Sequence, residues 1–231
     1  MPKLLEALGA PPGLLTWLIE CENEADPPWE TCGRADWILW IAACQGADFF
    51  TLLRTSVACV RLAISASVGP TQRLHQAMTV LEDASTFEDC ERAAELCHET
   101  TRGAPASYRT GPGNTFQTLI DASESLVSAA KVLCALAARR QAQSQLDALH
   151  RATAVGVPPI LMEAIDEIVV RVEPHRLDEA PSLSEEAAFL SLLGQAVGLA
   201  AKALPGRPSV AAQREAEETL ADEVYDRLYG G

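Results

Sequence analysis

The chain has 231 residues, of which 48% are hydrophobic and 22% are charged, so it can bury a large core without disulfides or metals. Its net charge of −14 would repel phosphate backbones and anionic lipid headgroups, which argues against nucleic-acid and membrane partners. The same charge would attract a basic protein. Aromatic residues make up only 5% of the chain, and this balance favours helices over sheets because strands prefer aromatic and β-branched side chains.

Apolar residues recur at the helical period through the first third of the chain. The stretch "PPGLLTWLIECE" predicts a helix whose first turn is formed by prolines. After an acidic loop, a helix is predicted over residues 34–44, stopped by Gly46, and another over residues 47–68. The residues expected to face inward from the second of these are Phe49, Phe50, Leu53, Val57, Val60 and Ile64.

The middle of the chain predicts a helical pair followed by one long helix. "TQRLHQAMTVLEDA" and "TFEDCERAAELCHETT" form the pair, and Thr86 is the expected N-cap of the second helix. Residues 102–114 are rich in glycine and proline and predict a loop; their "GPGN" lacks the Gly-Lys-Ser/Thr and the preceding strand of a phosphate loop. Asn114 is expected to cap a helix that reaches about residue 153, with a narrow seam of Leu119, Leu126, Ala130, Leu133 and Ala137.

The last third predicts three more helices, near residues 159–172, 183–204 and 208–229. The run "IVVRVE" could form a strand, but it continues a helical pattern and has no obvious partner strand. We therefore expect an all-α fold, a compact bundle of about eight to nine helices without significant sheet. Residues 1–156 would form an alanine-rich helical core, with the acidic helices of residues 157–231 packed on the same domain.

The seven cysteines predict free thiols in a reducing, cytoplasmic protein, because their number is odd and most stand among apolar neighbours. Cys90, Cys97 and His98 come closest to a metal-ligand set, but Cys90 and Cys97 are seven residues apart, which is core spacing. We expect no metal and no cofactor. No signal peptide is recognised, and charges or prolines interrupt every apolar segment, so no membrane span is expected either.

The segment "CGRADWILW" places opposite charges at the start of an apolar helix. Asp36 lies in the first turn, where the helix dipole favours a negative charge, and an unpaired carboxylate beside Trp37 and Trp40 would be costly. Its cationic partner could be Arg34, or an arginine of the next helix, in which case the pair would fix the angle between the two helices. A structural lock is favoured over partner binding or chemistry, since no second acid, nucleophile or metal ligand stands nearby. The arginines of the next helix are Arg54 and Arg61.

The segment "CGRADWILWIA", followed by a helix holding "ACVRLA" and by "TFEDCERAAELC", resembles a family of immunity proteins from bacterial polymorphic toxin systems. The resemblance covers roughly residues 14–145, and residues 157–231 have no counterpart in it. It implies a non-enzymatic inhibitor that binds and neutralises a cognate toxin. The residues that it marks as defining the family are Arg34, Asp36, Trp37 and Trp40.

The last predicted helix offers a candidate partner-binding surface. Residues 158–231 carry 14 acidic and 6 basic side chains, a net of −8, which is over half of the charge of the chain. Leu220, Val224 and Leu228 form the expected inward stripe, and the opposite side mixes acids with tyrosines, which are favoured at protein interfaces. The tyrosines could instead pack on a neighbouring helix. The residues of this candidate surface are Glu215, Glu218, Asp222, Tyr225, Asp226 and Tyr229.

Three kinds of function remain open from the sequence. The first is an immunity-type inhibitor of a basic toxin, whose complex would weaken in high salt. The second is a helical adaptor or regulatory scaffold, whose association, or homo-oligomerisation, would be hydrophobic and insensitive to salt. The third is an enzyme, for which His75, Glu95 and His98 are the best acid–base candidates, although no catalytic constellation supports them and no catalytic residue is expected.

Overall fold

The structure is a computed structural model that describes residues 2–7, 10–21, 32–67, 69–104, 114–154, 183–204 and 210–229. Every regular element in these ranges is a helix, which confirms the predicted all-α bundle. The helices are α1 (Pro2–Ala7), α2 (Pro12–Cys21), α3 (Ala35–Cys44), α4 (Phe49–Ala66), α5 (Gln72–Glu82), α6 (Phe87–Gly103), α7 (Thr115–Ala154), α9 (Leu183–Ala203) and α10 (Val210–Tyr229).

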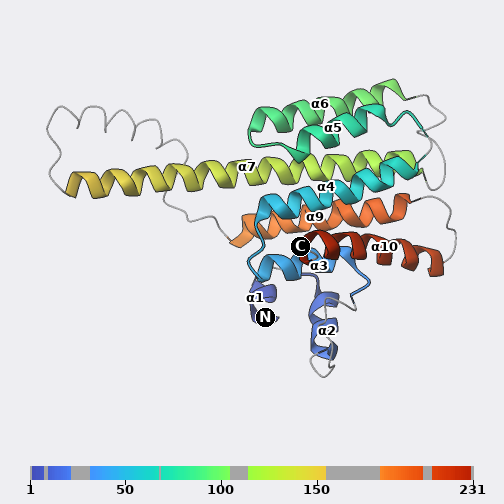
Figure 1. The fold of residues 1–231 in the computed structure, drawn as a ribbon, viewed down its shortest axis with the longest axis horizontal. Coiled ribbons are helices and arrows are strands. Elements are labelled where there is room, and N and C mark those ends of the chain that lie inside the picture. Colours follow the sequence, from blue (N-terminus) through green and yellow to red (C-terminus); the bar gives the residue numbers. More distant parts are fainter. Residues whose placement is uncertain are drawn as a thin grey trace.

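The helices are stacked in layers around the long helix α7 (Figure 1). The α5–α6 pair covers one side of α7, and α4 and α9 cover the other. Beyond them, α3 and α10 pack against α4 and α9, and α1 and α2 lie at the outer edge. The helix α3, which carries the charged pair and two tryptophans, is therefore enclosed by α1, α9 and α10.

Local signals in the sequence set several helix boundaries. The side chain of Asp48 accepts a hydrogen bond from the Thr51 amide at the start of α4. Thr86 and Asp89 form a reciprocal capping box at the start of α6, and Asn114 Oδ1 accepts from the Gln117 amide at the start of α7. The caps predicted at Thr86 and Asn114 are confirmed.

The helix α3 ends where the sequence predicts. Gly46 has a φ of +89°, a conformation that residues with a side chain rarely adopt, and it follows the last turn of α3 directly. The chain can then reverse into α4 within a few residues.

The helix α4 provides much of the core. Leu53, Val57, Val60 and Ile64 are buried as predicted, whereas Phe49 and Phe50 in the first turn are only partly buried. The pattern missed further core residues of this helix, because the helix is covered from several sides rather than along one stripe. They are Leu52, Cys59 and Ala63.

By length and composition α4 could cross a membrane, which the sequence analysis did not predict. Half of its apolar window is buried inside the bundle, and the helix packs against α5, α7, α9 and α10. It also carries Arg54, which donates a hydrogen bond to the Glu82 carbonyl oxygen of α5, and Arg61, which forms an ion pair with the Glu82 carboxylate. These contacts make α4 a core helix of this fold.

Other predictions about the chain have mixed outcomes. The short helix α1 was not predicted from the sequence. The seam of α7 is buried at Leu119, Leu126, Ala130 and Leu133, but Ala137 is partly exposed. The predicted helix at residues 159–172, the run "IVVRVE", the acidic loop before α3 and most of the glycine-rich loop lie outside the described residues. The helix α9 packs on α3, α4 and α7, and its buried residues belong to the same hydrophobic cluster as theirs.

Candidate functional site

At the start of α3, the side chains of Arg34 and Asp36 form hydrogen bonds with each other. Arg34 Nε donates to Asp36 Oδ1 at 2.9 Å, and Arg34 Nη2 donates to Asp36 Oδ2 at 2.7 Å. Two parallel bonds of this kind form the geometry in which a guanidinium and a carboxylate match best. The Arg34 guanidinium also lies 4.8 Å from the centre of the Trp37 ring, in cation–π range.

The idea that Asp36 bonds to an arginine of the next helix is wrong. Arg54 Nε donates to the carbonyl oxygen of Glu82 at 3.1 Å, and Arg61 Nη2 lies 2.6 Å from Glu82 Oε2. The two arginines therefore tie α4 to α5. Arg34, two residues from Asp36, forms its bonds within one turn of chain and needs no alignment of a second helix.

The two tryptophans of α3 have different neighbours. Trp37 is partly buried, and its ring centre lies 5.7 Å from that of Trp17, which joins α3 to α2. Trp40 is only 3% exposed, and its indole nitrogen lies near Gly194 of α9. Trp37 therefore contacts α2, whereas Trp40 lies beside α9.

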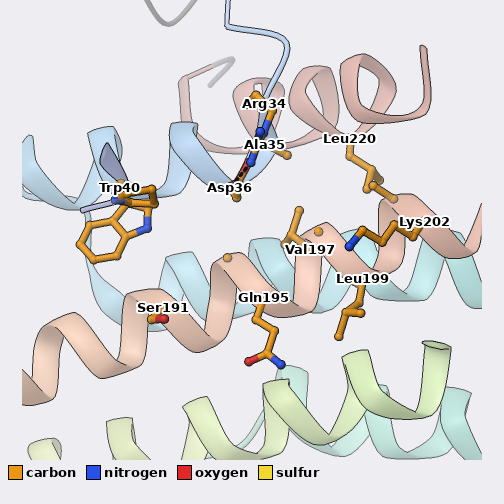
Figure 2. Close-up of a pocket in the computed structure, with 14 residues that line it drawn as sticks. Arg34, Ala35, Asp36, Trp40, Ser191, Gln195, Val197, Leu199, Lys202 and Leu220 are labelled. Carbon is orange, nitrogen blue, oxygen red and sulfur yellow. Dashed lines mark hydrogen bonds and ion pairs between the residues drawn. The ribbon is translucent and has the colours of Figure 1, made fainter. Parts of the chain in front are cut away.

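A cavity of about 720 Å³ opens between the start of α3, α9 and α10. We call it the α3–α9 cavity. Figure 2 shows the Arg34–Asp36 pair and Trp40 on the α3 side, with α9 opposite. Its volume falls within the range of small-molecule sites. The residues that line it include Arg34, Asp36, Trp40, Gly194, Gly198, Lys202 and Leu220.

Small residues of α9 create this space. A Cβ atom added at Gly194 would lie 3.6 Å from Asp36 Cβ and 3.9 Å from Trp40 Nε1, which is ordinary contact. A Cβ atom added at Gly198 would meet nothing within 4 Å. The sequence analysis missed this feature, although glycines four residues apart on a helix could have indicated a face that leaves room for a neighbour.

The predicted partner-binding surface on α10 is partly as expected. Leu220 and Val224 are buried, and Asp222 and Asp226 are exposed one turn apart on the outer side, with Tyr225 partly exposed between them. No described cation pairs with either aspartate. We call Asp222, Tyr225 and Asp226 the acidic face of α10.

The other predicted residues of this surface are placed differently. Tyr229 packs on the core, and its hydroxyl donates to Gln45 Oε1 at 2.7 Å, while burial raises the pKa of this phenol. Glu218 lies against the start of α3, since a Cβ atom added at Gly33 would be 3.3 Å from its Cγ. The side chain of Glu215 is outside the described residues. Glu218 therefore connects the acidic face of α10 with the region of the charged pair.

The cysteines are free thiols, and all except the partly exposed Cys44 are buried. Burial raises the pKa of Cys59, Cys90 and Cys97 to about 12 each, and that of Cys32 to about 11. These thiols stay protonated at neutral pH, which removes the thiolate that nucleophilic chemistry needs.

The acid–base candidates named from the sequence do not converge. His75 lies on α5, while Glu95 and His98 lie on α6, and none of the three borders the α3–α9 cavity. His98 Nδ1 lies 4.0 Å from Glu124 Oε1 on an exposed surface. Among the described residues, no three His, Cys, Asp or Glu side chains are grouped so that they could hold a metal ion.

Comparison of the chain with protein-family models, with curated proteins and with solved structures found no match.

Proposed function

We propose that the protein is a non-enzymatic, immunity-type inhibitor that binds and neutralises a basic protein toxin in the cytoplasm. The proposal rests on the sequence resemblance around the charged pair of α3 and on the acidic face of α10. The helical adaptor is the alternative that the experiment below separates from it.

The observation that carries the proposal is a set of charges that do not help the fold. Asp222 and Asp226 are exposed, like-charged and one helical turn apart, which destabilises a helix slightly. Asp226 also lies in the last turn of α10, where the helix dipole disfavours a negative charge. A basic partner would relieve both costs on binding, and the negative field would speed its approach.

The tyrosine between the two aspartates supports the same surface. The ring of Tyr225 packs at a tilt against that of Tyr229, with ring centres 5.3 Å apart, and Tyr229 is itself held by its hydrogen bond to Gln45. A partly exposed ring that is already held in place loses little conformational freedom on binding, which suits an interface anchor.

The exposed apolar side chains give less support to an adaptor. In the described part of the chain the large ones are Ile19, Leu62 and Phe87, which lie on three different helices, α2, α4 and α6. A hydrophobic adaptor surface would gather such residues into one patch.

The proposal expects the gene beside this one to encode a basic protein toxin, and the experiment uses the protein that this gene encodes. That protein is expressed in a bacterial host with and without the inhibitor, and cell growth and complex formation on a sizing column are measured. The double variant Asp222→Lys/Asp226→Lys should lose both rescue and complex while keeping the helicity of the wild type. The matched control is Glu91→Lys/Glu95→Lys, which reverses two exposed acids with the same spacing on α6.

The outcomes separate the candidate functions. Rescue that fails only in the α10 variant, and a complex that weakens with salt, would support the proposal. A complex that is indifferent to salt and to both variants would favour the adaptor. Turnover of a substrate by the purified protein would exclude a purely inhibitory role.

A further inference from the structure

Two buried thiols on neighbouring helices lie in contact with each other. The Sγ atoms of Cys90 on α6 and Cys134 on α7 are 3.7 Å apart, close to the van der Waals contact distance of two sulfurs. The two helices pack side by side (Figure 1). Because a disulfide bond is about 2.05 Å long, its formation requires the sulfurs to approach by only roughly 1.7 Å. Small rotations of the two side chains can provide this movement.

The two thiols share a hydrogen bond, and the shifts of their pKa values indicate its direction. Burial raises the pKa of Cys90 to about 12, and the charge and hydrogen bond of Cys134 add to this rise. Burial also raises the pKa of Cys134, but the hydrogen bond with Cys90 opposes that rise. Cys90 is therefore the donor, and the pair loses its first proton from Cys134. Since oxidation starts from a thiolate, Cys134 is the thiol that reacts first.

Cys134 is also the thiol that solvent can reach. Its exposed fraction is 9%, whereas that of Cys90 is 0%. Phe87, one turn before Cys90, is 52% exposed, and Lys131, one turn before Cys134, places its Nζ atom 5.1 Å from the centre of the Phe87 ring. The charge of Lys131 opposes part of the rise in the pKa of Cys90, while that of Asp89 adds to it. This limited access suits a small, neutral oxidant and excludes a bulky one.

We propose that Cys90 and Cys134 form a redox pair, in which a small hydroperoxide oxidises the two thiols to a disulfide that joins α6 to α7. The Cys134 thiolate attacks one oxygen of the hydroperoxide, so that an S–O bond forms, the O–O bond breaks and the leaving oxygen takes up a proton. The Cys90 sulfur then attacks the sulfenic acid on Cys134. The S–S bond forms, the S–O bond breaks, and the departing hydroxide takes the Cys90 proton to give water. Two electrons pass from the thiols to the hydroperoxide.

Contact between the two sulfurs favours the second step. A thiol already held beside the sulfenic acid reacts without the entropy cost of an encounter, which offsets the small thiolate fraction of Cys90. The disulfide would close a loop of chain 44 residues long, and cross-links of this kind stabilise a fold by restricting the unfolded chain. Because α10 packs mainly on α3, α4 and α9, this redox pair is independent of the acidic face of α10.

The test treats the full chain with hydrogen peroxide and counts free thiols by mass spectrometry after alkylation. The chain should lose two of its seven free thiols and give a cross-linked peptide pair that contains Cys90 and Cys134. It should still migrate as a single chain on a non-reducing gel. The thermal midpoint should rise by about 5–10 °C. Dithiothreitol, which itself becomes a disulfide, should restore all seven thiols and the original midpoint.

Two matched variants locate the reaction. Cys90→Ala and Cys97→Ala each remove one fully buried thiol from α6. Under peroxide, Cys90→Ala should form no disulfide within the chain, and its midpoint should not rise. Cys97→Ala should form the Cys90–Cys134 disulfide to the same extent as the wild type, with a similar rise.

A wild-type chain that keeps all seven thiols under peroxide would overturn the proposal. A disulfide that involves other cysteines, or that joins two chains, would overturn it as well. So would a Cys90–Cys134 disulfide that lowers the thermal midpoint, because the two sulfurs could then be joined only by distorting the packing of α6 on α7.

Discussion

At the scale of single residues, the Arg34–Asp36 pair shows how bonding geometry determines the contribution of a surface ion pair to the free energy of unfolding. The Arg34 side chain is 46% exposed and that of Asp36 is 18% exposed, and exposed pairs commonly contribute less than about 1 kcal/mol. This pair has two parallel hydrogen bonds and a ring beneath the guanidinium. Its contribution should therefore lie at the upper end of that range.

Arg34→Lys should lower the free energy of unfolding by about 0.5–1 kcal/mol, because a lysine keeps the charge but loses the second bond and the flat contact with Trp37. Urea unfolding measures this change. The control is Arg73→Lys, at an exposed pair with Glu99, where we expect a change of only a few tenths of a kcal/mol. Equal stability of wild type and Arg34→Lys would mean that the pair does not lock α3.

The buried thiols predict a loss of stability at alkaline pH. Burial raises the pKa of Cys59 from 9.0 to about 12, so the folded state holds this proton more tightly than the unfolded state. The resulting stabilisation is complete below pH 9 and is lost as the pH rises toward 12. Unfolding free energy should fall by on the order of 1 kcal/mol per pH unit for each such thiol.

Urea unfolding near neutral pH and at about pH 10 measures this loss. Cys59→Ala should be less stable near neutral pH because it leaves a cavity, but its stability should fall less steeply with pH. Identical pH slopes for the variant and the wild type would contradict the assignment to this thiol.

At the scale of helices, the capping box of α6 combines a stabilising contact with a shifted carboxyl group. The Thr86 hydroxyl, followed by the amides of Ser85 and Thr86, lowers the pKa of Asp89 below its ordinary value of 3.8. The contribution of this carboxylate is present above that value and is lost as the pH falls through the lower folded pKa.

Thr86→Ala should cost about 1 kcal/mol of unfolding free energy through loss of the cap. It should also let the pKa of Asp89 rise toward its ordinary value, because the largest cause of the shift is removed. An NMR titration of the Asp89 carboxyl carbon measures the second effect. A titration curve that matches the wild type would show that the backbone amides alone hold the pKa down.

The helix α10 offers a test of whether its acidic face serves function rather than stability. Asp226→Asn removes one charge of a like-charged pair and one unfavourable charge from the last turn. We expect it to raise the unfolding free energy by a few tenths of a kcal/mol. The same variant should weaken binding of the basic partner, measured by calorimetry. A variant that loses both stability and binding would instead assign Asp226 to the fold.

The helices could be predicted from the sequence where their cause is local. Periodicity and caps located α3 to α7, α9 and α10, since Thr86, Asn114 and Gly46 act within one turn of chain. The outer position of Tyr229 was predicted from its angle on a helical wheel. A wheel does not show that a neighbouring turn, here at Gln45, reaches over the end of α10.

The α3–α9 cavity could not be predicted from the sequence, because it exists only once three helices are assembled. The sequence indicated that Asp36 pairs with an arginine, but it left Arg34, Arg54 and Arg61 open as the partner, and the structure shows Arg34. Trp40 and Lys202 are far apart in the sequence, and only the packing of α3 on α9 brings them to one space. The residues next to Gly198 in the sequence do not indicate whether another helix fills the space left by its missing side chain.

At the scale of the whole molecule, a net charge of −14 acts on folding and on binding in opposite directions. Like charges repel one another across the folded surface, and this repulsion lowers the stability of the compact state. The same field attracts a basic partner and raises its association rate. Dissolved salt screens both effects, since the screening length falls to roughly 10 Å at 0.1 M.

Raising the salt concentration should therefore stabilise the free protein while it weakens the complex. We expect the thermal midpoint of the free chain to rise between low and moderate sodium chloride, and the affinity for the basic partner to fall over the same range. Scanning calorimetry and titration calorimetry in one series of buffers measure the two trends. Sodium chloride is preferred to sulfate, because sulfate stabilises folded proteins by exclusion as well as by screening. If salt strengthened the complex, apolar contacts rather than the acidic face of α10 would have to hold the partner, and the scaffold function would become the better explanation.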